Sequence, residues 1–193
     1  MCGRLDVSNP LSHAVTMALN INFQTEDNHD LRPTQKVSTV TAINGQLQQL
    51  DTTWGIKPNW AKKLLINAQA ESVAEKPTFK RAFEEHRCVV PFSGWYEWSE
   101  KEGKGKQKYL FSFDNYEPVY MAGIWYTPVT DALPELVTLT TTPIESCKPY
   151  HHRMPLLIPE TAVSDWMTSP ASEALGFLAV SVEPNKLNIV KAA

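Results

Sequence analysis

The residue of this sequence best suited to covalent chemistry is a cysteine at position 2. The chain begins Met1-Cys2-Gly3-Arg4, and methionine aminopeptidases remove Met1 when the second residue is small. The processed chain then starts with an amine and a thiol on adjacent carbons, both with a pKa of about 8. This pair can condense with an aldehyde and close a thiazolidine ring, or the thiolate can act as a plain nucleophile. The alternative is a small residue at a frayed chain end.

Two further segments offer groups for acid–base chemistry. Residues 93–98, Ser-Gly-Trp-Tyr-Glu-Trp, place Glu97 among three aromatic residues. A carboxyl group in apolar surroundings has a raised pKa and can transfer protons near neutral pH. The alternative is an aromatic strand with one solvated glutamate. Residues 150–155 contain His151 and His152, and we expect at most one of them to point into a given site, because adjacent strand residues face opposite sides.

The elements that position these residues are predicted to be mainly strands. Asn44-Gly45 separates Val37–Ile43 from Leu47–Thr53 and is a strong hairpin signal. Residues Leu65–Glu71 pass from apolar to polar, as a strand emerging at a site would. The further predicted strands are Cys88–Phe92, Tyr109–Phe113, Val119–Tyr126, Val137–Thr142 and Phe177–Val182.

Helices are fewer than strands. Apolar residues from Leu11 to Leu19 follow a 3.6-residue period, a second helix begins after Pro159, and weaker signals occur at Phe79–Glu85 and Ile144–Pro149. Short turns between successive strands favour antiparallel pairing. The sequence therefore predicts one α+β domain over residues 1–193, with mainly antiparallel strands in a closed or folded, barrel-like sheet and a few flanking helices.

Composition and charge limit the function classes. The chain has 193 residues and a net charge of −3, yet residues 51–108 contain eleven Lys/Arg against eight Asp/Glu. This basic stretch permits binding to a polyanion, although a solvated lysine face is an equal alternative. Neither a secretory signal nor an apolar run of about 20 residues is visible, so we expect a cytoplasmic protein without membrane association. Cys88 and Cys147 are predicted to be core residues.

Six motifs occur in an order that resembles the SRAP family, the SOS response-associated peptidases. The resemblance runs from residue 2 to about residue 182. The motifs are Met1-Cys2-Gly3-Arg4, Trp54-Gly55 with Pro58 and Trp60, Ile66-Asn67-Ala68, residues 74–79, residues 94–98, and residues 151–155. The combination of the first motif with Gly-Trp-Tyr-Glu-Trp and His-x-Arg-Met-Pro is specific.

The resemblance implies a protein that crosslinks to abasic sites in single-stranded DNA. Cys2 would form a thiazolidine with the ring-opened sugar aldehyde, Asn67 would orient the amine and sugar, Glu97 would shuttle protons, and His151 would act on the sugar oxygen. It also implies lyase activity and autocatalytic removal of the amino-terminal residue. The implied DNA-binding residues are Arg4, Arg153, Trp54, Trp60, Trp98, Lys80 and Pro33.

The chain departs from the family pattern at three places. Gln69 stands where the family commonly has an arginine, which removes one phosphate-binding group. Arg32 occupies the family's Asn-x-Ala-Pro loop, here Asp30-Leu31-Arg32-Pro33, and can compensate. His152 stands where aspartate is usual, which alters the charge around His151.

Two other functions fit single features of the sequence. A cysteine peptidase acting on other proteins would use Cys2 with His151 and Glu97. A metal site would use Cys147, His151 and His152, but Cys-x₃-His-His is not a standard zinc pattern. We therefore expect no metal, no cofactor and no obligate protein partner, and a monomer that binds single-stranded DNA.

Overall fold

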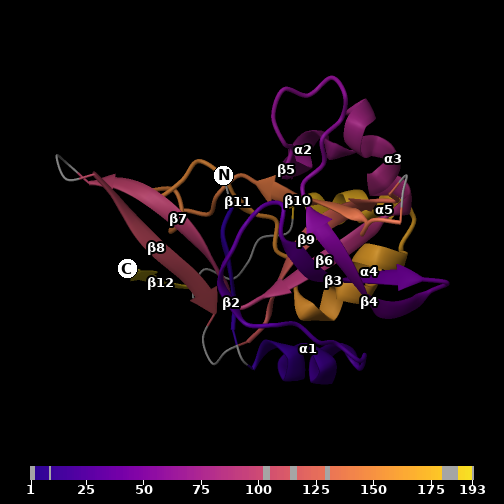
Figure 1. Cartoon of the computed structure of the whole chain (residues 1–193), viewed down its shortest axis with the longest axis horizontal. Helices are drawn as coiled ribbons and strands as arrows, with labels where there is room; N and C mark the ends of the chain where they lie inside the picture. Colours follow the sequence, from indigo (N-terminus) through magenta and orange to yellow (C-terminus); the bar gives the residue numbers. More distant parts are fainter. Residues whose placement is uncertain are drawn as a thin grey trace.

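Two sheets form the frame of the molecule. The computed structural model describes residues 3–8, 10–101, 105–113, 117–128, 131–179 and 187–192. The first sheet is antiparallel throughout and has five strands in the order β12 (Leu187–Lys191), β8 (Gly105–Phe113), β7 (Gly94–Lys101), β1 (Leu5–Val7) and β2 (Asn28–Leu31). In Figure 1 the β7–β8 hairpin projects away from the rest of the chain.

The second sheet closes on itself. Its path runs β11 (Met154–Pro155), β10 (Glu135–Thr141), β4 (Gln46–Trp54), β3 (Lys36–Ile43), β6 (Arg87–Phe92) and β9 (Val119–Tyr126), and β5 (Asn67–Gln69) pairs with β10. Because β9 also pairs with β10, the strands form a ring. Among the described strands, β10 is parallel to β4 and β5, and the other pairs are antiparallel. The predicted α+β class with mainly antiparallel strands is confirmed.

The hairpin predicted around Asn44-Gly45 is confirmed. β3 and β4 pair from Lys36–Thr53 to Ile43–Gln46. Asn44 and Gly45 have φ of 53° and 75°, the left-handed conformation that a two-residue hairpin turn requires and that asparagine and glycine adopt at low cost.

Helices cover the ring-like sheet at its periphery. They are α1 (Leu11–Leu19), α2 (Ala70–Val73), α3 (Pro77–Glu85), α4 (Val163–Thr168) and α5 (Ala171–Ala174). The predictions for α1, α3 and the helix after Pro159 are confirmed, the last with a 3₁₀ turn at Glu160–Ala162 before α4. Figure 1 shows α2 to α5 gathered on one side and α1 apart from them. Among the described residues, no helix is long and apolar enough to span a membrane.

Two secondary-structure predictions near the carboxyl end are wrong. Leu175–Ala179 form a 3₁₀ helix where a strand over Phe177–Val182 was predicted, and residues 180–182 lie outside the described residues. The Phe177 ring packs edge-on against Trp166, with ring centroids 6.2 Å apart, so the apolar signal reflects packing on α4. Residues 145–150 form consecutive turns where a helix over Ile144–Pro149 was predicted. Strand β12 was not predicted.

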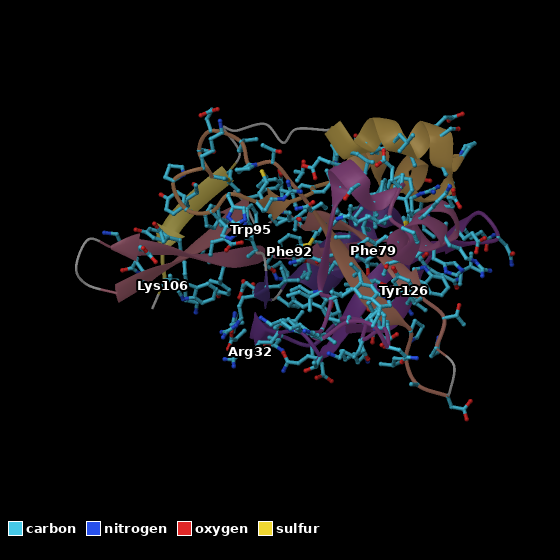
Figure 2. The ribbon with its side chains drawn as sticks, turned by 90° about the horizontal axis from the view of Figure 1, so that it is seen from above. Arg32, Phe79, Phe92, Trp95, Lys106 and Tyr126 are labelled. Atoms are coloured by element: carbon cyan, nitrogen blue, oxygen red, sulfur yellow. The ribbon has the colours of Figure 1, made fainter. Side chains whose placement is uncertain are left out.

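The core lies inside the ring and between the two sheets. Figure 2 shows Phe92 and Trp95 close together in the middle of the molecule, and their ring centroids lie 6.2 Å apart. Cys88 and Cys147 are buried, as predicted. Burial raises the pKa of both thiols, that of Cys147 to about 11, so neither is a ready nucleophile.

Candidate active site

Strand β1 holds the start of the described chain against β7. Leu5 pairs with Trp95, and Asp6 with Gly94. The Tyr96 N–H donates to the Arg4 carbonyl at 3.0 Å, so the next step of this antiparallel register brings Gly3 opposite Glu97. Cys2, the predicted nucleophile, lies outside the described residues.

Glu97 faces the interior. Its neighbour on the same face of the sheet, Trp95, stacks on Phe111 with ring centroids 4.9 Å apart. Glu97 is 4% exposed, and this burial raises the pKa of its carboxyl to about 7. The prediction of an acid in apolar surroundings is confirmed, and the alternative of a solvated glutamate is wrong.

The segment 144–153 covers the face of the sheet that carries Glu97. The Tyr150 ring meets Tyr109 and Phe111 edge-on, at 4.6 and 5.3 Å between centroids, and the Ser99 hydroxyl donates to the Pro149 carbonyl at 3.3 Å. The charge of Glu97 adds to the raised pKa of the Cys147 thiol, whose main cause is burial. This packing brings the histidine motif to the glutamate.

His151 is fixed by the backbone around it. Its N–H donates to the Cys147 carbonyl at 3.2 Å, and its ring Nδ1 accepts from the Arg153 N–H at 3.0 Å. The ring is half-buried, and burial lowers the pKa of His151 below its ordinary value. The imidazole is therefore neutral at pH 7 and able to exchange a proton.

Asn67 enters the site from the ring-like sheet. It opens β5 opposite Thr138 of β10, and the Thr138 hydroxyl donates to its Oδ1. That bond directs the amide NH₂ away from Thr138. β10 pairs with β11 on its other side, through Thr140 and Pro155, so Asn67 and the histidine segment flank one strand. β10 thus connects Asn67 with the histidine segment, which in turn packs on the face of the other sheet that carries Glu97.

Arg153 is engaged by a carboxylate. Its Nη1 and Nη2 donate to Glu71 Oε1 and Oε2 at 2.8 and 2.7 Å, and Nη2 also donates to the Thr140 carbonyl. The Arg153 side chain is 13% exposed. The Arg153 hydrogen bonds hold the pKa of Glu71 below its usual range, so the pair stays ionised and neutral overall.

Arg4 lies on the opposite face of the five-stranded sheet. Its Nη1 is ion-paired with Asp30 Oδ1, and its guanidinium lies 5.4 Å from the centroid of the half-buried Trp98 ring. Arg32 donates to Asp30 Oδ2 through Nε, at 2.8 Å, and through Nη2. One carboxylate therefore holds two arginines.

The structure corrects the prediction for Trp54. Its ring is completely buried and its Nε1–H donates to the Ile66 carbonyl at 3.1 Å, so it has no surface on which a base could stack. The tryptophan instead anchors β4 beside β5 and supports Asn67. Its apolar ring fills the core, and its N–H finds the partner that a buried indole needs.

Trp60 has the opposite environment. It is 68% exposed on the loop 55–66, which a bridge between Ile56 and Leu65 closes and which rises above β5 and α2 in Figure 1. The loop contains no acidic residue, and its exposed cations are Lys57, Lys62 and Lys63. Lys80 is exposed on α3, and Pro33 is half-buried in the turn after β2.

The two histidines are not separated as predicted. The rings of His151 and His152 lie 4.2 Å apart, because residues 151–153 are not a strand and do not alternate faces. Within the described part of the chain, no group of three His, Cys, Asp or Glu residues is placed to hold a metal.

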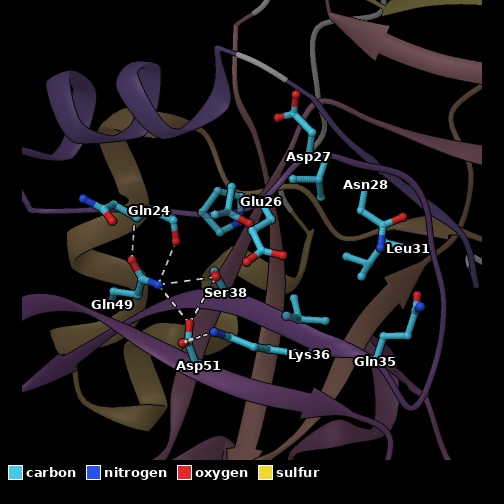
Figure 3. Close-up of a pocket in the computed structure, with 14 residues that line it drawn as sticks. Gln24, Glu26, Asp27, Asn28, Leu31, Gln35, Lys36, Ser38, Gln49 and Asp51 are labelled. Atoms are coloured by element: carbon cyan, nitrogen blue, oxygen red, sulfur yellow. Dashed lines mark hydrogen bonds and ion pairs between the residues drawn. The ribbon is translucent and has the colours of Figure 1, made fainter.

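A cavity of about 670 Å³ lies elsewhere. Figure 3 shows it between residues 24–28 and strands β3 and β4, with Lys36 ion-paired to Asp51 at 2.7 Å and Gln49 bonded to Gln24, Ser38 and Asp51. None of the predicted site residues lines this cavity, so volume alone does not locate the chemistry.

Sequence reasoning missed Glu71, Asp30 and Thr138. Glu71 and Asp30 lie inside the quoted motif regions, so an acid near a predicted arginine was a usable signal. Thr138 belonged to a predicted core strand without assigned chemistry. Its contact with Asn67 joins residues 71 positions apart, and no local pattern predicts such a contact.

The chain is similar in sequence to known proteins. The chain is 28% identical to abasic site processing protein YoqW of Bacillus subtilis over 181 residues, 86% of this chain and 80% of the relative. It is 29% identical to abasic site processing protein YedK of Escherichia coli over 147 residues, 75% of this chain and 66% of the relative.

Solved structures have the same fold. A protein from Bordetella bronchiseptica superposes with a TM-score of 0.84 at 20% identity and full coverage of both chains. A phage-related protein from the same organism gives a TM-score of 0.83 at 21% identity, over 99% of this chain and 94% of the other. The SOS response associated peptidase (SRAP) family matches residues 1–192, and the chain therefore belongs to this family.

Proposed function

We propose that the protein binds single-stranded DNA at abasic sites and crosslinks to it through Cys2, once Met1 has been removed. The relatives named above are abasic site processing proteins. Glu97 carries the proposal, because its proton affinity suits catalysis near neutral pH and it lies opposite the residue that follows Cys2. A strand register and a buried carboxyl thus join the amino-terminal motif to the acid–base motif.

The crosslink is a condensation that releases one water. The α-amine of Cys2 attacks the C1′ aldehyde of the ring-opened sugar and gives a carbinolamine. The carbinolamine loses water to form an imine, and the thiolate then adds to the imine carbon. The new carbon–sulfur bond closes the thiazolidine ring, and the nitrogen takes up the proton that the thiol released.

Glu97 and His151 move the protons of these steps. Glu97 accepts a proton from the ammonium group and returns it to the departing hydroxyl of the carbinolamine. The neutral His151 ring exchanges a proton with the sugar oxygen as the ring opens to the aldehyde. Asn67, with its Oδ1 held by Thr138, donates through its NH₂ to orient the amine and the sugar.

The same intermediates account for a lyase activity. The imine acidifies the neighbouring C2′–H, and loss of that proton with expulsion of the 3′-phosphate cleaves the strand. Hydrolysis of the Met1–Cys2 peptide bond by the same groups consumes one water and exposes the amine. This self-processing step is an alternative to removal of Met1 by an aminopeptidase.

The DNA strand is proposed to follow the cations and exposed rings around the site. Trp60 has a free face for base stacking between lysines, and stacking contributes about 1–3 kcal/mol per base. Arg4 beside Trp98, together with Lys80, offers contacts to phosphates. Pro33 shapes the turn that carries Arg32. Arg153 reaches a phosphate only by exchanging Glu71 for it.

Intact mass spectrometry tests the proposal. Incubation with an abasic single-stranded oligonucleotide should yield protein without Met1 whose mass has increased by the oligonucleotide less one water. Cys2→Ala should give no adduct, whereas Cys147→Ala, which removes a buried thiol, should still give one. An adduct on Cys2→Ala, or an adduct on a chain that retains Met1, would contradict the aminothiol mechanism.

A further inference from the structure

Arg32 takes no part in the crosslinking steps, and its surroundings indicate how it can replace the phosphate-binding arginine that Gln69 removes. Arg32 and Arg4 hold opposite oxygens of the same Asp30 carboxylate. Two guanidinium groups and one carboxylate leave a net charge of +1 in the cluster. The hydrogen bonds from Arg32 and Arg4 keep the pKa of Asp30 below its usual range, so this charge does not change near neutral pH.

The cluster is open to solvent and has N–H donors that the described contacts do not use. The side chains of Arg4 and Arg32 are 30% and 53% exposed. A guanidinium has five N–H donors, and the described contacts use Nη1 of Arg4 and Nε and Nη2 of Arg32. Asp30 holds both guanidinium groups and the Trp98 ring contacts that of Arg4, so their remaining N–H groups can act as two forks. Such forks match the geometry of a phosphate.

The position of the cluster relates it to the site. Arg4 directly precedes β1, and its carbonyl accepts from Tyr96, the residue before Glu97. The cluster lies on the other face of β1 and β7 from Glu97. Arg4 follows the proposed nucleophile Cys2 by two residues, a reach of at most about 7 Å along the chain, so a neighbouring phosphate of the strand that reacts with Cys2 can extend to the cluster. Arg153, on the other side of the candidate site, is neutralised by Glu71, which leaves Arg4 and Arg32 as the open guanidinium pair of the described residues.

We propose that Arg4 and Arg32, held on Asp30, form a two-arginine cradle for a DNA phosphate beside the abasic nucleotide. In this arrangement Arg32 supplies the second fork and helps to set the affinity for the strand. The inference rests on the proposed function for its choice of ligand. The binding itself is separable from crosslinking, because a strand without an abasic site has the same phosphates.

Fluorescence anisotropy with a labelled, intact single-stranded oligonucleotide tests the cradle. Arg32→Gln should weaken binding about tenfold at low salt, as expected for a lost charge-assisted hydrogen bond. The slope of log Kobs against log salt should decrease by about 0.7, the contribution of one contact to a single-stranded phosphate. Arg32→Lys should keep the slope while losing part of the affinity, because the charge remains and the fork does not.

Lys36→Gln is the matched control. Lys36 is exposed and ion-paired with Asp51 in the cavity of Figure 3, so this variant removes the same unit of charge four residues from Arg32 without changing an Asp30 partner. It should bind DNA as the wild type does. Equal losses for Arg32→Gln and Lys36→Gln would overturn the inference, because net charge alone would then explain them.

The two proposals fail in different ways. If the wild type forms the abasic adduct and Arg32→Gln binds intact strands unchanged, the cradle is wrong and the proposed function stands. If the wild type binds intact strands through Arg32 but forms no adduct, the crosslinking function is wrong and the cradle stands. Inorganic phosphate at matched ionic strength should compete poorly, and strong competition would indicate a free-phosphate site instead.

Discussion

Arginine side chains form ion pairs with carboxylates on two sides of the candidate site. The two sides differ in the number of arginines that share the carboxylate and in how deeply these are buried. Arg153 gives both terminal nitrogens to Glu71 and lies almost out of solvent. Arg4 and Arg32 share Asp30 and lie at the surface. One arginine with one carboxylate has no net charge, whereas two arginines with one carboxylate have a net charge of +1, which can attract an anionic ligand. We therefore propose that the same residue types serve structure in one place and binding in the other.

Glu97 completes the comparison as a carboxyl whose burial raises its pKa, in contrast to Asp30 and Glu71. Its raised pKa means that the folded state binds a proton more tightly than the unfolded state does. Stability from this group is full below its ordinary pKa of 4.5 and is lost as the pH rises to about 7. Asp30 and Glu71 have lowered pKa values, so their contributions are lost in the opposite direction, as the pH falls.

The largest effect is expected for Glu97→Gln. The unfolding free energy of the variant minus that of the wild type should increase by about 3 kcal/mol between pH 4 and pH 8, because only the wild type must ionise a buried carboxyl. Urea unfolding across this range measures the difference. The adduct rate of the wild type should rise as the pH passes through about 7, and the variant should keep only the later rise that follows deprotonation of the amine and thiol near pH 8. A parallel pH dependence of the two proteins would show that Glu97 is not buried as described.

Arg153→Met should have the next largest effect. The change removes the Arg153 donors from the Glu71 carboxylate and the Thr140 carbonyl, which we expect to cost about 2 kcal/mol of unfolding free energy. Chemical denaturation gives the value, and Glu71→Gln with Arg153→Met completes a double-mutant cycle. A loss below about 0.5 kcal/mol would mean that the pair behaves like an ordinary surface salt bridge.

Gln69→Arg should make the Arg153–Glu71 pair resemble the cluster of Arg4 and Arg32 on Asp30. Gln69 is exposed in β5, two residues before Glu71, and an arginine there would give Glu71 two guanidinium partners. Single-strand affinity should rise about tenfold, or about 1.4 kcal/mol. Anisotropy titration measures it, with Gln107→Arg, on β8, as a control of equal charge. An equal rise in both variants would indicate a general charge effect.

The smallest effect on stability is expected for Arg32→Gln. An exposed ion pair contributes about 0–1 kcal/mol, and Arg4 still holds Asp30 in the variant. Thermal unfolding of the two proteins should therefore nearly coincide, while DNA binding differs. A clear loss of stability would place Arg32 with Arg153, as a structural residue.

Local patterns predicted a large part of the fold. The β3–β4 hairpin follows from two residues that accept positive φ, and α1 follows from a periodic apolar stripe. The patterns failed where packing decides the conformation. Phe177 and its neighbours contain the residues of a strand but pack on Trp166 as a 3₁₀ helix, and β12 forms because β8 offers it an edge.

The site shows the same division. The motifs named Asn67, Glu97 and His151 in advance, and the buried carboxyl was expected from its aromatic neighbours. Trp54 was predicted to bind DNA because the sequence of a motif does not distinguish a buried tryptophan from an exposed one. Its complete burial and the exposure of Trp60 became visible only when β4 was placed against β5.

The sequence by itself determined the chemical groups, the family and the strands that carry the motifs, because residue types and short-range periodicity are local properties. Only the tertiary structure decided which groups meet. It brought Glu97 opposite the start of β1 and joined Thr138 to Asn67 by a hydrogen bond. It also paired Arg153 with Glu71 away from solvent. At the surface, it placed Arg4 and Arg32 together on Asp30. These contacts join residues far apart in the chain, and their charge and burial follow from the packing of two sheets.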